Sequence, residues 1–214
     1  MLIALLAKSK KHGGRCIAGV EVMQKDGRYT ILRDKGEPRW IRPVTRSGHG
    51  EVPSELVSKL NLLDIVEFPD LRPKPDGFQS ENFTSGSLKP RLVARLSKTA
   101  SVLDEFVTTR TGPLFGNRGK AIIAGKIGDL DHSLLLVAAD DAEFEATTNV
   151  KGNPQLRVRF TYDSVEYDLP VTDPEFQDLF SEGLSFTSCY LTLSVGVENE
   201  GWHSKLVAGV FLLE

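Results

Sequence analysis

Apolar and polar residues alternate along much of this chain with the period of two that is typical of β-strands. Leu156, Val158 and Phe160 alternate with polar side chains until Asp163 and Ser164, which predict a hairpin turn. The run at 205–213 is apolar on both sides, so we expect it to be a central, buried strand. Strands are expected at 2–8, 15–23, 28–34, 39–44 and 62–68 in the first half, and at 155–162, 165–171, 189–198 and 205–213 in the second.

Helical patterns are few and short, and they fall at 53–60, 101–110 and 171–183. The last has the clearest start, because Asp173 can cap a helix that begins with Pro174, and Gly183 is expected to end it. Two sets of roughly five strands, each with a short helix, predict an all-β protein built as two small barrels. The glycine-rich segment 110–120 separates them, and we place the domains at 1–115 and 116–214.

The formal net charge of −3 conceals two halves of opposite sign. Residues 1–120 hold 21 Lys and Arg against 13 Asp and Glu, a net charge of +8, whereas residues 121–214 hold 5 against 16, a net charge of −11. A basic half beside an acidic half indicates an anionic partner for the first, electrostatic complementarity between the two, or both.

Cys16 and Cys189 are the only cysteines, and free thiols in a reducing cytoplasm are the simplest account of them. The apolar run at the start is too short for a secretory signal and its positive charges follow it, so we interpret it as a first strand. No later run reaches the roughly 18 apolar residues that cross a bilayer. We therefore expect a cytoplasmic protein that does not bind membranes.

The sequence has no catalytic or cofactor signature. It lacks a GxGxxG or Walker motif, and its histidines and acidic residues lack the spacing of zinc or calcium ligands. Cys16 follows a cationic loop that contains His12 and could lower its thiol pKa, but a small buried cysteine at the start of a strand is the commoner case. We expect no catalytic residue, no cofactor and no metal.

Trp40 is the most informative single residue, because arginines surround it. A strand through 39–44 places Trp40 and Arg42 on one side and Ile41 on the other. If Ile41 packs inward, the indole and the guanidinium face outward and can stack a base and hold a phosphate. In the opposite arrangement Trp40 fills the barrel, and a carboxylate such as Glu51 or Glu67 covers Arg42.

Clustered cations accompany Trp40, since residues 1–50 hold 11 Lys and Arg against 4 Asp and Glu. Such a cluster beside an exposed aromatic side chain is typical of nucleic-acid binding. The candidate binding residues are Lys10, Lys11, Arg15, Arg39, Trp40, Arg42 and Arg46.

A second group of polar residues precedes Phe83. Gln79, Glu81 and Asn82 could read a base edge or a ribose, and with Cys16 they could line a small pocket. They could equally tie one loop to another.

Several stretches together carry a resemblance: HGGRCIAG, WIRPV, LLDIVEF, the segment from Gln79 to Asn82, YDLPVTDPEF, and CYLTLSVGVENEGWHSKLVAGV. In this order they resemble the prokaryotic family of dual OB domain-containing proteins over nearly the whole chain. The resemblance implies two tandem OB-like barrels, a fold that commonly binds single-stranded nucleic acid. It implies no reaction and no active residue, and a link to antiviral defence is a further expectation.

We therefore expect a non-catalytic module that binds nucleic acid, single-stranded rather than duplex, on its basic N-terminal barrel. One alternative is an adaptor subunit that binds a protein partner through its acidic C-terminal barrel. Another is a sensor or enzyme for a nucleotide-like small molecule, with Cys16, Arg42, Glu81 and Asn82 in one pocket.

Overall fold

The computed structural model describes residues 1–11, 13–46, 50–149, 151–180 and 185–213. It divides the chain into two compact units, Met1–Thr109 and Arg110–Glu214, where the sequence predicted domains of 1–115 and 116–214. Unit 1 holds 18 Lys and Arg against 13 Asp and Glu, a net charge of +5, and unit 2 holds 8 against 16, a net charge of −8. The opposite signs predicted for the two halves therefore apply to the two units.

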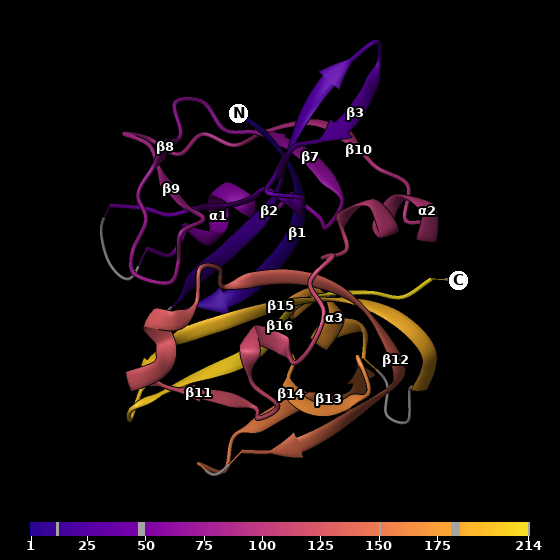
Figure 1. The fold of residues 1–214 in the computed structure, drawn as a ribbon. Coiled ribbons are helices and arrows are strands. Elements are labelled where there is room, and N and C mark those ends of the chain that lie inside the picture. Colours follow the sequence, from indigo (N-terminus) through magenta and orange to yellow (C-terminus); the bar gives the residue numbers. More distant parts are fainter. Residues whose placement is uncertain (12, 47–49, 150, 181–184, 214) are drawn as a thin grey trace. The chain divides into compact units, whose positions relative to one another are not determined.

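Unit 1 is built on a curled sheet whose strands run in the order β10-β7-β1-β2-β6-β9-β8, with β3 paired to β2 (Figure 1). The run at the start of the chain is the first strand, as predicted. Its elements are β1 (Leu2–Lys11), β2 (Gly14–Lys25), β3 (Arg28–Ile31), β4 (Arg33–Asp34), β5 (Glu37–Pro38), β6 (Trp40–Pro43), α1 (Ser54–Val57), β7 (Asp64–Glu67), β8 (Arg72–Pro73), β9 (Asn82–Thr84), β10 (Arg91–Arg95), α2 (Ala100–Leu103) and the 3₁₀ turn η1 (Asp104–Phe106).

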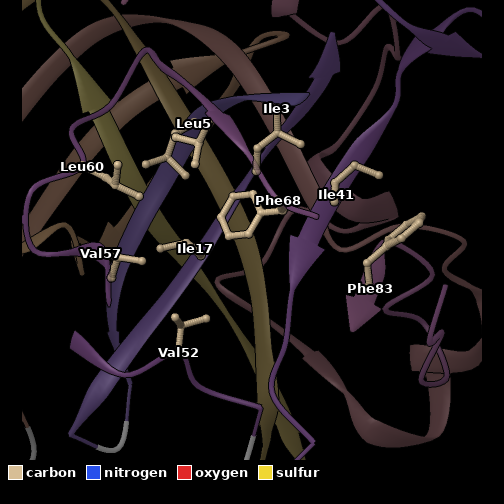
Figure 2. Close-up of a cluster of buried hydrophobic side chains, with 10 residues drawn as sticks. Ile3, Leu5, Ile17, Ile41, Val52, Val57, Leu60, Phe68 and Phe83 are labelled. Carbon is tan, nitrogen blue, oxygen red and sulfur yellow. The ribbon is translucent and has the colours of Figure 1, made fainter. Parts of the chain in front are cut away.

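The core of unit 1 collects alternate side chains from these strands (Figure 2). Ile17 of β2 and Ile41 of β6 are fully buried, and α1 and its following turn close one side with Val57 and Leu60. Because side chains of a strand alternate between the two faces of a sheet, the neighbours of Ile41 must face outward. The core is Ile3, Leu5, Ile17, Ile41, Val52, Val57, Leu60, Val66, Phe68 and Phe83.

Unit 2 has the strand order β11-β16-β15-β12-β13-β14. The predicted hairpin turn is confirmed, since Asp163 and Ser164 both take positive φ between β13 and β14. The predicted central strand is confirmed as well, because β16 lies between β11 and β15. The elements are η2 (Leu114–Gly116), β11 (Ala121–Ile123), η3 (Ala124–Asp129), β12 (Leu134–Thr148), β13 (Pro154–Tyr162), β14 (Val165–Pro170), α3 (Pro174–Leu179), β15 (Ser185–Asn199) and β16 (Trp202–Phe211).

The helix of unit 2 begins as the sequence predicts. The Asp173 carboxylate accepts hydrogen bonds from the backbone N–H groups of Glu175 and Phe176, and Pro174 follows it at the first helical position. The end expected at Gly183 lies outside the described residues. None of the helices in the described ranges has the length and apolar character that a membrane-spanning helix needs.

Both units close in the same way, through one parallel contact between strands that are otherwise antiparallel. In unit 1, β6 pairs with β9 through Arg42 and Asn82; in unit 2, Val171, just after β14, pairs with Val207 of β16. In each unit the short helix α1 or α3 lies between the third and fourth strands of this barrel. Five strands with this order and one helix in this position are the topology of an OB barrel, so the chain is all-β with two such barrels.

Candidate nucleic-acid interface

Trp40 and Arg42 face outward from the barrel of unit 1, because Ile41 between them is fully buried in its core. This is the side that the first interpretation of the sequence predicts. Trp40 lies opposite Val20 of β2 and is partly exposed. An indole in this position presents part of its surface to solvent.

Arg42 is buried, although it lies on the same face as Trp40. Only 3% of the arginine is exposed, and its Nη2 lies 3.2 Å from Oε1 of Glu81, whose side chain is 5% exposed. The other guanidinium nitrogen, Nη1, donates to Oδ1 of Asn82 at 3.3 Å. The expectation that Arg42 offers its charge to a phosphate is therefore wrong, because the guanidinium is withdrawn from the surface and neutralised by Glu81 rather than by Glu51 or Glu67.

Gln79, Glu81 and Asn82 are brought together with Arg42, as a shared pocket would require. Asn82 donates through Nδ2 to Oε1 of Gln79 at 3.1 Å, and the backbone N–H of Arg42 donates to the Glu81 carbonyl oxygen at 2.7 Å. Glu81 and Asn82 are nearly buried, so these groups bind one another and fasten the loop before β9 onto β6. Cys16 lies elsewhere on β2, opposite Ser9 of β1, which leaves the proposed pocket without its thiol.

The remaining predicted cations lie on β1, on β2, just before β6 and in the loop after β6. Lys10 and Arg46 are exposed, and Arg15 is half-buried, with its Nη1 donating to the Gly14 carbonyl oxygen. Arg39 is exposed but forms a 2.7 Å ion pair with Glu21. The Lys11 side chain and all of His12 and His49 lie outside what the structure describes.

Two cations that the sequence did not single out lie on the same side as Trp40. Arg72 pairs with Thr84, and the backbone N–H of Lys74 donates to the Asn82 carbonyl oxygen at 2.8 Å, so β8 continues the sheet beyond β9. Pro73 pairs with the core residue Phe83, and alternation therefore turns Arg72 and Lys74 outward. Both are exposed. The alternation of cations with prolines at 72–75 was the available signal, since proline is tolerated on an edge strand.

These side chains form one surface, which we call the outer face. Neighbouring strands lie about 4.8 Å apart, so β8 runs roughly 10 Å from β6. The exposed cations at β8 are therefore separated from the partly exposed indole of Trp40 on β6 by the buried polar side chains of Arg42 and Asn82. Thr84 adds a buried hydroxyl oxygen with no hydrogen-bond partner among the described residues. The outer face consists of Trp40, Arg42, Asn82, Thr84, Arg72 and Lys74.

Unit 2 presents a different surface on its strands β12, β13 and β14. A hollow of about 420 Å³ lies there, with Arg157 and Arg159 of β13 between acidic neighbours. Arg157 donates to Asp168 at 2.7 Å, and Arg159 lies 3.4 Å from Glu143. Each guanidinium is thus already matched by a carboxylate, and this surface has no excess of positive charge. The hollow is lined by Glu143, Phe144, Glu145, Thr147, Arg157, Arg159, Asp168 and Ser185.

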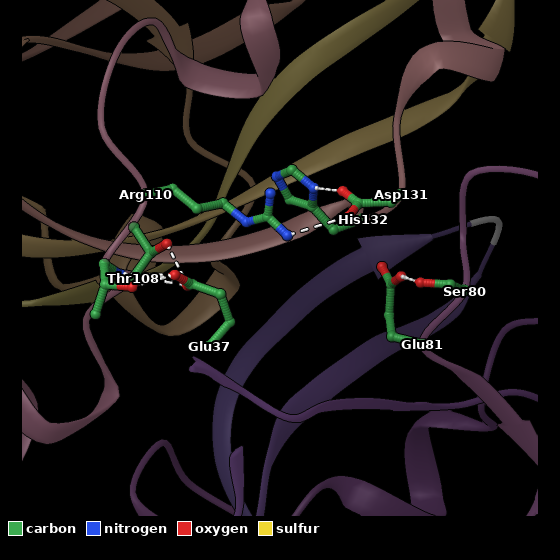
Figure 3. Close-up of polar contacts among 8 residues, drawn as sticks. Glu37, Ser80, Glu81, Thr108, Arg110, Asp131 and His132 are labelled. Carbon is green, nitrogen blue, oxygen red and sulfur yellow. Dashed lines mark hydrogen bonds and ion pairs between the residues drawn. The ribbon is translucent and has the colours of Figure 1, made fainter. Parts of the chain in front are cut away.

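Two further polar clusters support the fold rather than a ligand (Figure 3). In unit 1 the Glu37 carboxylate accepts hydrogen bonds from the Thr108 hydroxyl at 2.6 Å and from the Thr109 backbone N–H at 3.1 Å. In unit 2 Asp131 accepts from Arg110 and lies 2.6 Å from His132 Nδ1, and these contacts lower the pKa of its carboxyl, the His132 bond most. The two clusters hold the residues on either side of the unit boundary to their own units: Thr108 and Thr109 to unit 1, and Arg110 to unit 2.

Nothing in the described ranges gathers three or more His, Cys, Asp or Glu side chains as a metal site would. Cys189 is buried, and burial raises the pKa of its thiol to about 12, so it stays protonated at neutral pH. The Cys189 thiol is therefore not a nucleophile at neutral pH.

Comparison with known proteins gives one strong result. A family model described as a dual OB-containing domain matches residues 1–210. No curated protein matches the chain.

Among solved structures, a murine DNA-binding protein bound with double-stranded DNA is similar at 6% identity and a TM-score of 0.35, covering 99% of this chain and 95% of the other. The tetrameric p202 HIN2 is similar at 10% identity and a TM-score of 0.30, covering 99% and 91%. Both likenesses are too remote to bear on what this chain binds.

Proposed function

Because the chain belongs to the dual OB-containing domain family, we propose that it is a nucleic-acid-binding module and that its ligand lies on the outer face of unit 1. The observation that carries this proposal is the position of Trp40 on the same side of the sheet as the exposed Arg72 and Lys74. OB barrels bind oligonucleotides across the face of their second and third strands, and β2 and β6 are those strands here.

The chemistry of the outer face suits a single strand. A base stacks on the indole of Trp40, which contributes about 1 to 3 kcal/mol per stacked base and does not select among bases. The phosphates on either side reach Arg72 and Lys74, whose contribution depends on the release of counterions and hence on salt. The buried Arg42 contacts no phosphate; it holds Glu81 and Asn82 so that β9 and β8 stay in register with β6.

Fluorescence anisotropy with a short labelled single-stranded oligonucleotide tests this proposal. We expect Trp40→Ala to weaken binding about 5- to 150-fold, the range that corresponds to one lost stack. Lys74→Ala should lower the slope of log affinity against log salt by about 1. The matched control is Lys59→Ala, which removes an exposed lysine just after α1 and should leave both quantities unchanged.

A second readout uses the two tryptophans of the chain. In a Trp202→Phe background Trp40 is the sole indole, and a stacked base should quench its fluorescence with the same midpoint as the anisotropy change. Binding that persists in Trp40→Ala, with no quenching in the Trp202→Phe protein, would contradict a site at the outer face. No binding even at low salt would contradict nucleic-acid binding altogether.

A role as an adaptor subunit is the second candidate, and one observation favours it. Trp202 and Ile123 are cross-strand partners on the outside of unit 2 and remain 49% and 46% exposed. Contiguous exposed apolar surface marks protein-binding sites, and this pair supplies two large apolar side chains side by side. Purification of the tagged chain from its native host distinguishes the two, because an adaptor should bring a stoichiometric protein that Trp202→Ala releases.

A further inference from the structure

The buried polar centre of the outer face ends in the side-chain amide of Gln79. Arg42 and Asn82 are 3% and 5% exposed, whereas Gln79, which bonds to Asn82, is only partly buried. Phe83 packs into the core, so alternation turns the neighbouring Asn82 outward, and the amide of Gln79 lies against it on that side. Gln79 is therefore the member of this polar group that is most accessible to a ligand on the outer face.

The direction of these hydrogen bonds is fixed by Arg42. A guanidinium only donates, so Oδ1 of Asn82 accepts from Nη1 of Arg42 at 3.3 Å, and the Asn82 amide must turn its Nδ2 the other way. Nδ2 donates to Oε1 of Gln79 at 3.1 Å. The Gln79 amide is thereby oriented as well, with its oxygen held by Asn82 and its Nε2 on the far side. Arg42 thus decides which atom of Gln79 is left for a ligand.

The Gln79 side chain is a hydrogen-bond donor held in place before any ligand binds. Its Nε2 donates to no residue in the part of the chain that the structure describes. The backbone around it is tied down, because Gln79 N–H donates to the Asp76 carbonyl oxygen at 3.0 Å and Asp76 N–H donates back to that of Gln79 at 3.3 Å. A group ordered in advance loses little conformational freedom when a ligand arrives.

Gln79 lies within reach of a nucleotide stacked on Trp40. Arg42 follows Trp40 by two residues on the same face, about 6.6 Å along β6, and Asn82 pairs with Arg42 on the neighbouring strand, about 4.8 Å away. The Cα atoms of Trp40 and Asn82 are therefore roughly 8 Å apart. The amide of Gln79 adjoins Asn82, so it meets the edge of the stacked base or of the next base in the strand.

The bases differ in what they offer to such a donor. Thymine, uracil, guanine and cytosine each carry an exocyclic carbonyl oxygen, and adenine carries none. Glutamine usually reads adenine with both ends of its amide, donating to N7 and accepting from N6. Asn82 already donates to Oε1 of Gln79, and the N6 amino group of adenine would compete with it. Phosphates are the weaker alternative, since the exposed Arg72 and Lys74 attract them more strongly than a neutral amide does.

We infer that Gln79 is a specificity-determining residue of the outer face. Its Nε2 donates to a carbonyl oxygen of a base in the bound single strand, so that strands rich in thymine, uracil, cytosine or guanine are preferred over strands of adenine. This inference rests on the proposed function and names the class of strand that the site selects. Stacking on Trp40 supplies affinity without selecting a base, and the amide of Gln79 supplies the selection.

The experiment measures, by fluorescence anisotropy, the ratio of affinities for two short labelled single strands of equal length, oligo-dT and oligo-dA. Gln79→Glu keeps an oxygen that accepts from Asn82 and replaces the donating nitrogen by an acceptor. Gln79→Leu removes the donor without adding charge. Ser87→Asp is the matched control, because it adds the same charge as Gln79→Glu at an exposed position shortly after β9. Equal melting temperatures verify that each variant keeps the fold.

We expect the natural protein to bind oligo-dT more tightly than oligo-dA, and both Gln79 variants to lower this ratio about 2- to 10-fold, the range of one hydrogen bond. Gln79→Leu should do so by weakening the binding of oligo-dT and leaving that of oligo-dA unchanged. Ser87→Asp should affect both probes equally, since its charge acts on phosphates. Because adenine strands stack on themselves, the change in the ratio on substitution, rather than the ratio itself, reports the contact.

An unchanged ratio in both Gln79 variants, whether or not the two affinities fall together, would overturn the inference and leave the proposed function standing. A natural preference for oligo-dA that Gln79→Leu removes would overturn it by showing that the amide reads adenine. A ratio lowered equally by Ser87→Asp would do the same, because charge alone would then account for the effect. If neither probe binds the natural protein at low salt, the proposed function fails and the inference fails with it.

Discussion

Arg42 and Glu81 form an ion pair of 3.2 Å in which both side chains are almost wholly buried, although they lie 39 residues apart in the sequence. The pair joins β6 to the loop before β9, at the parallel contact that closes the barrel of unit 1. It determines the outer face indirectly, because β8, with Arg72, and the Lys74 that follows it are attached to the sheet through β9.

Removal of one member of this ion pair should lower the free energy of unfolding of unit 1 substantially. Arg42→Met leaves the Glu81 carboxylate buried without its cation, and a loss of about 3 to 5 kcal/mol is expected for such a change. The double variant Arg42→Met/Glu81→Met should lose less than the sum of the two single variants, since it buries no unpaired charge. Urea unfolding followed by Trp40 fluorescence in a Trp202→Phe background measures this cycle. Additive losses would show that the two charges are not coupled.

Gly19 is expected to tolerate no side chain. A Cβ at this position would lie 2.0 Å from the carbonyl oxygen of Ala4 on the neighbouring strand, and backbone atoms cannot move aside as a side chain can. Gly19→Ala should destabilise unit 1 by about 3 kcal/mol or more, the upper part of the usual range for overpacking. Gly86→Ala is the control, because nothing lies within 4 Å of its added Cβ. Thermal unfolding of the two variants should differ clearly, and equal melting temperatures would contradict the clash.

Asp173 should make unit 2 less stable as the pH rises. Burial raises the pKa of this carboxyl to about 6, against the hydrogen bonds from the Phe176, Val210 and Glu175 N–H groups, which lower it. A raised pKa means that the folded protein holds the proton more tightly than the unfolded chain. The stabilisation is complete below the unfolded pKa of 3.8 and is lost as the pH passes through about 6.

The variant Asp173→Asn tests this prediction, because it removes the titration and keeps a capping oxygen. Its stability relative to the natural protein should increase between pH 4 and pH 7, by at most about 3 kcal/mol for a shift of roughly two pKa units. Asp178→Asn, an exposed residue of the same helix, should show no such trend. A constant difference between pH 4 and pH 7 would contradict the raised pKa.

Removal of carboxylates should convert the hollow of unit 2 into an anion-binding surface. The triple variant Glu143→Gln, Glu145→Gln and Asp168→Asn leaves Arg157 and Arg159 without their acidic neighbours. Made in a Trp40→Ala/Arg72→Ala/Lys74→Ala protein, it should restore salt-dependent binding of DNA. Three amides at Asp129, Glu198 and Glu200 change the net charge equally and are the control. Equal binding by both would show that overall charge, rather than the arginines, is responsible.

The sequence predicted what depends on neighbouring residues. The turn at Asp163 and Ser164, the cap at Asp173 and the placement of Ile41 and Trp40 on opposite faces all follow from local conformation and from alternation along one strand. The all-β class and the two barrels follow from the count of such segments.

The contacts that the sequence could not predict depend on which strands pair with one another. Nothing near Arg42 shows that Glu81 will cover it, because the partner is fixed by the parallel pairing of β6 with β9. The same pairing brings β8 to the outer face, so Arg72 and Lys74 were missed although they are exposed cations. The sequence left two arrangements open for Trp40, so both its orientation and its surroundings required the fold.

The parallel contacts also have a consequence for the order of folding during synthesis. In each unit the parallel contact that closes the ring is made by a strand late in the chain, β9 in unit 1 and β16 in unit 2. The ribosome therefore delivers every segment needed to seal the basic barrel before the acidic one has begun, and in each unit the earlier strands wait with an open seam until the closing strand has emerged.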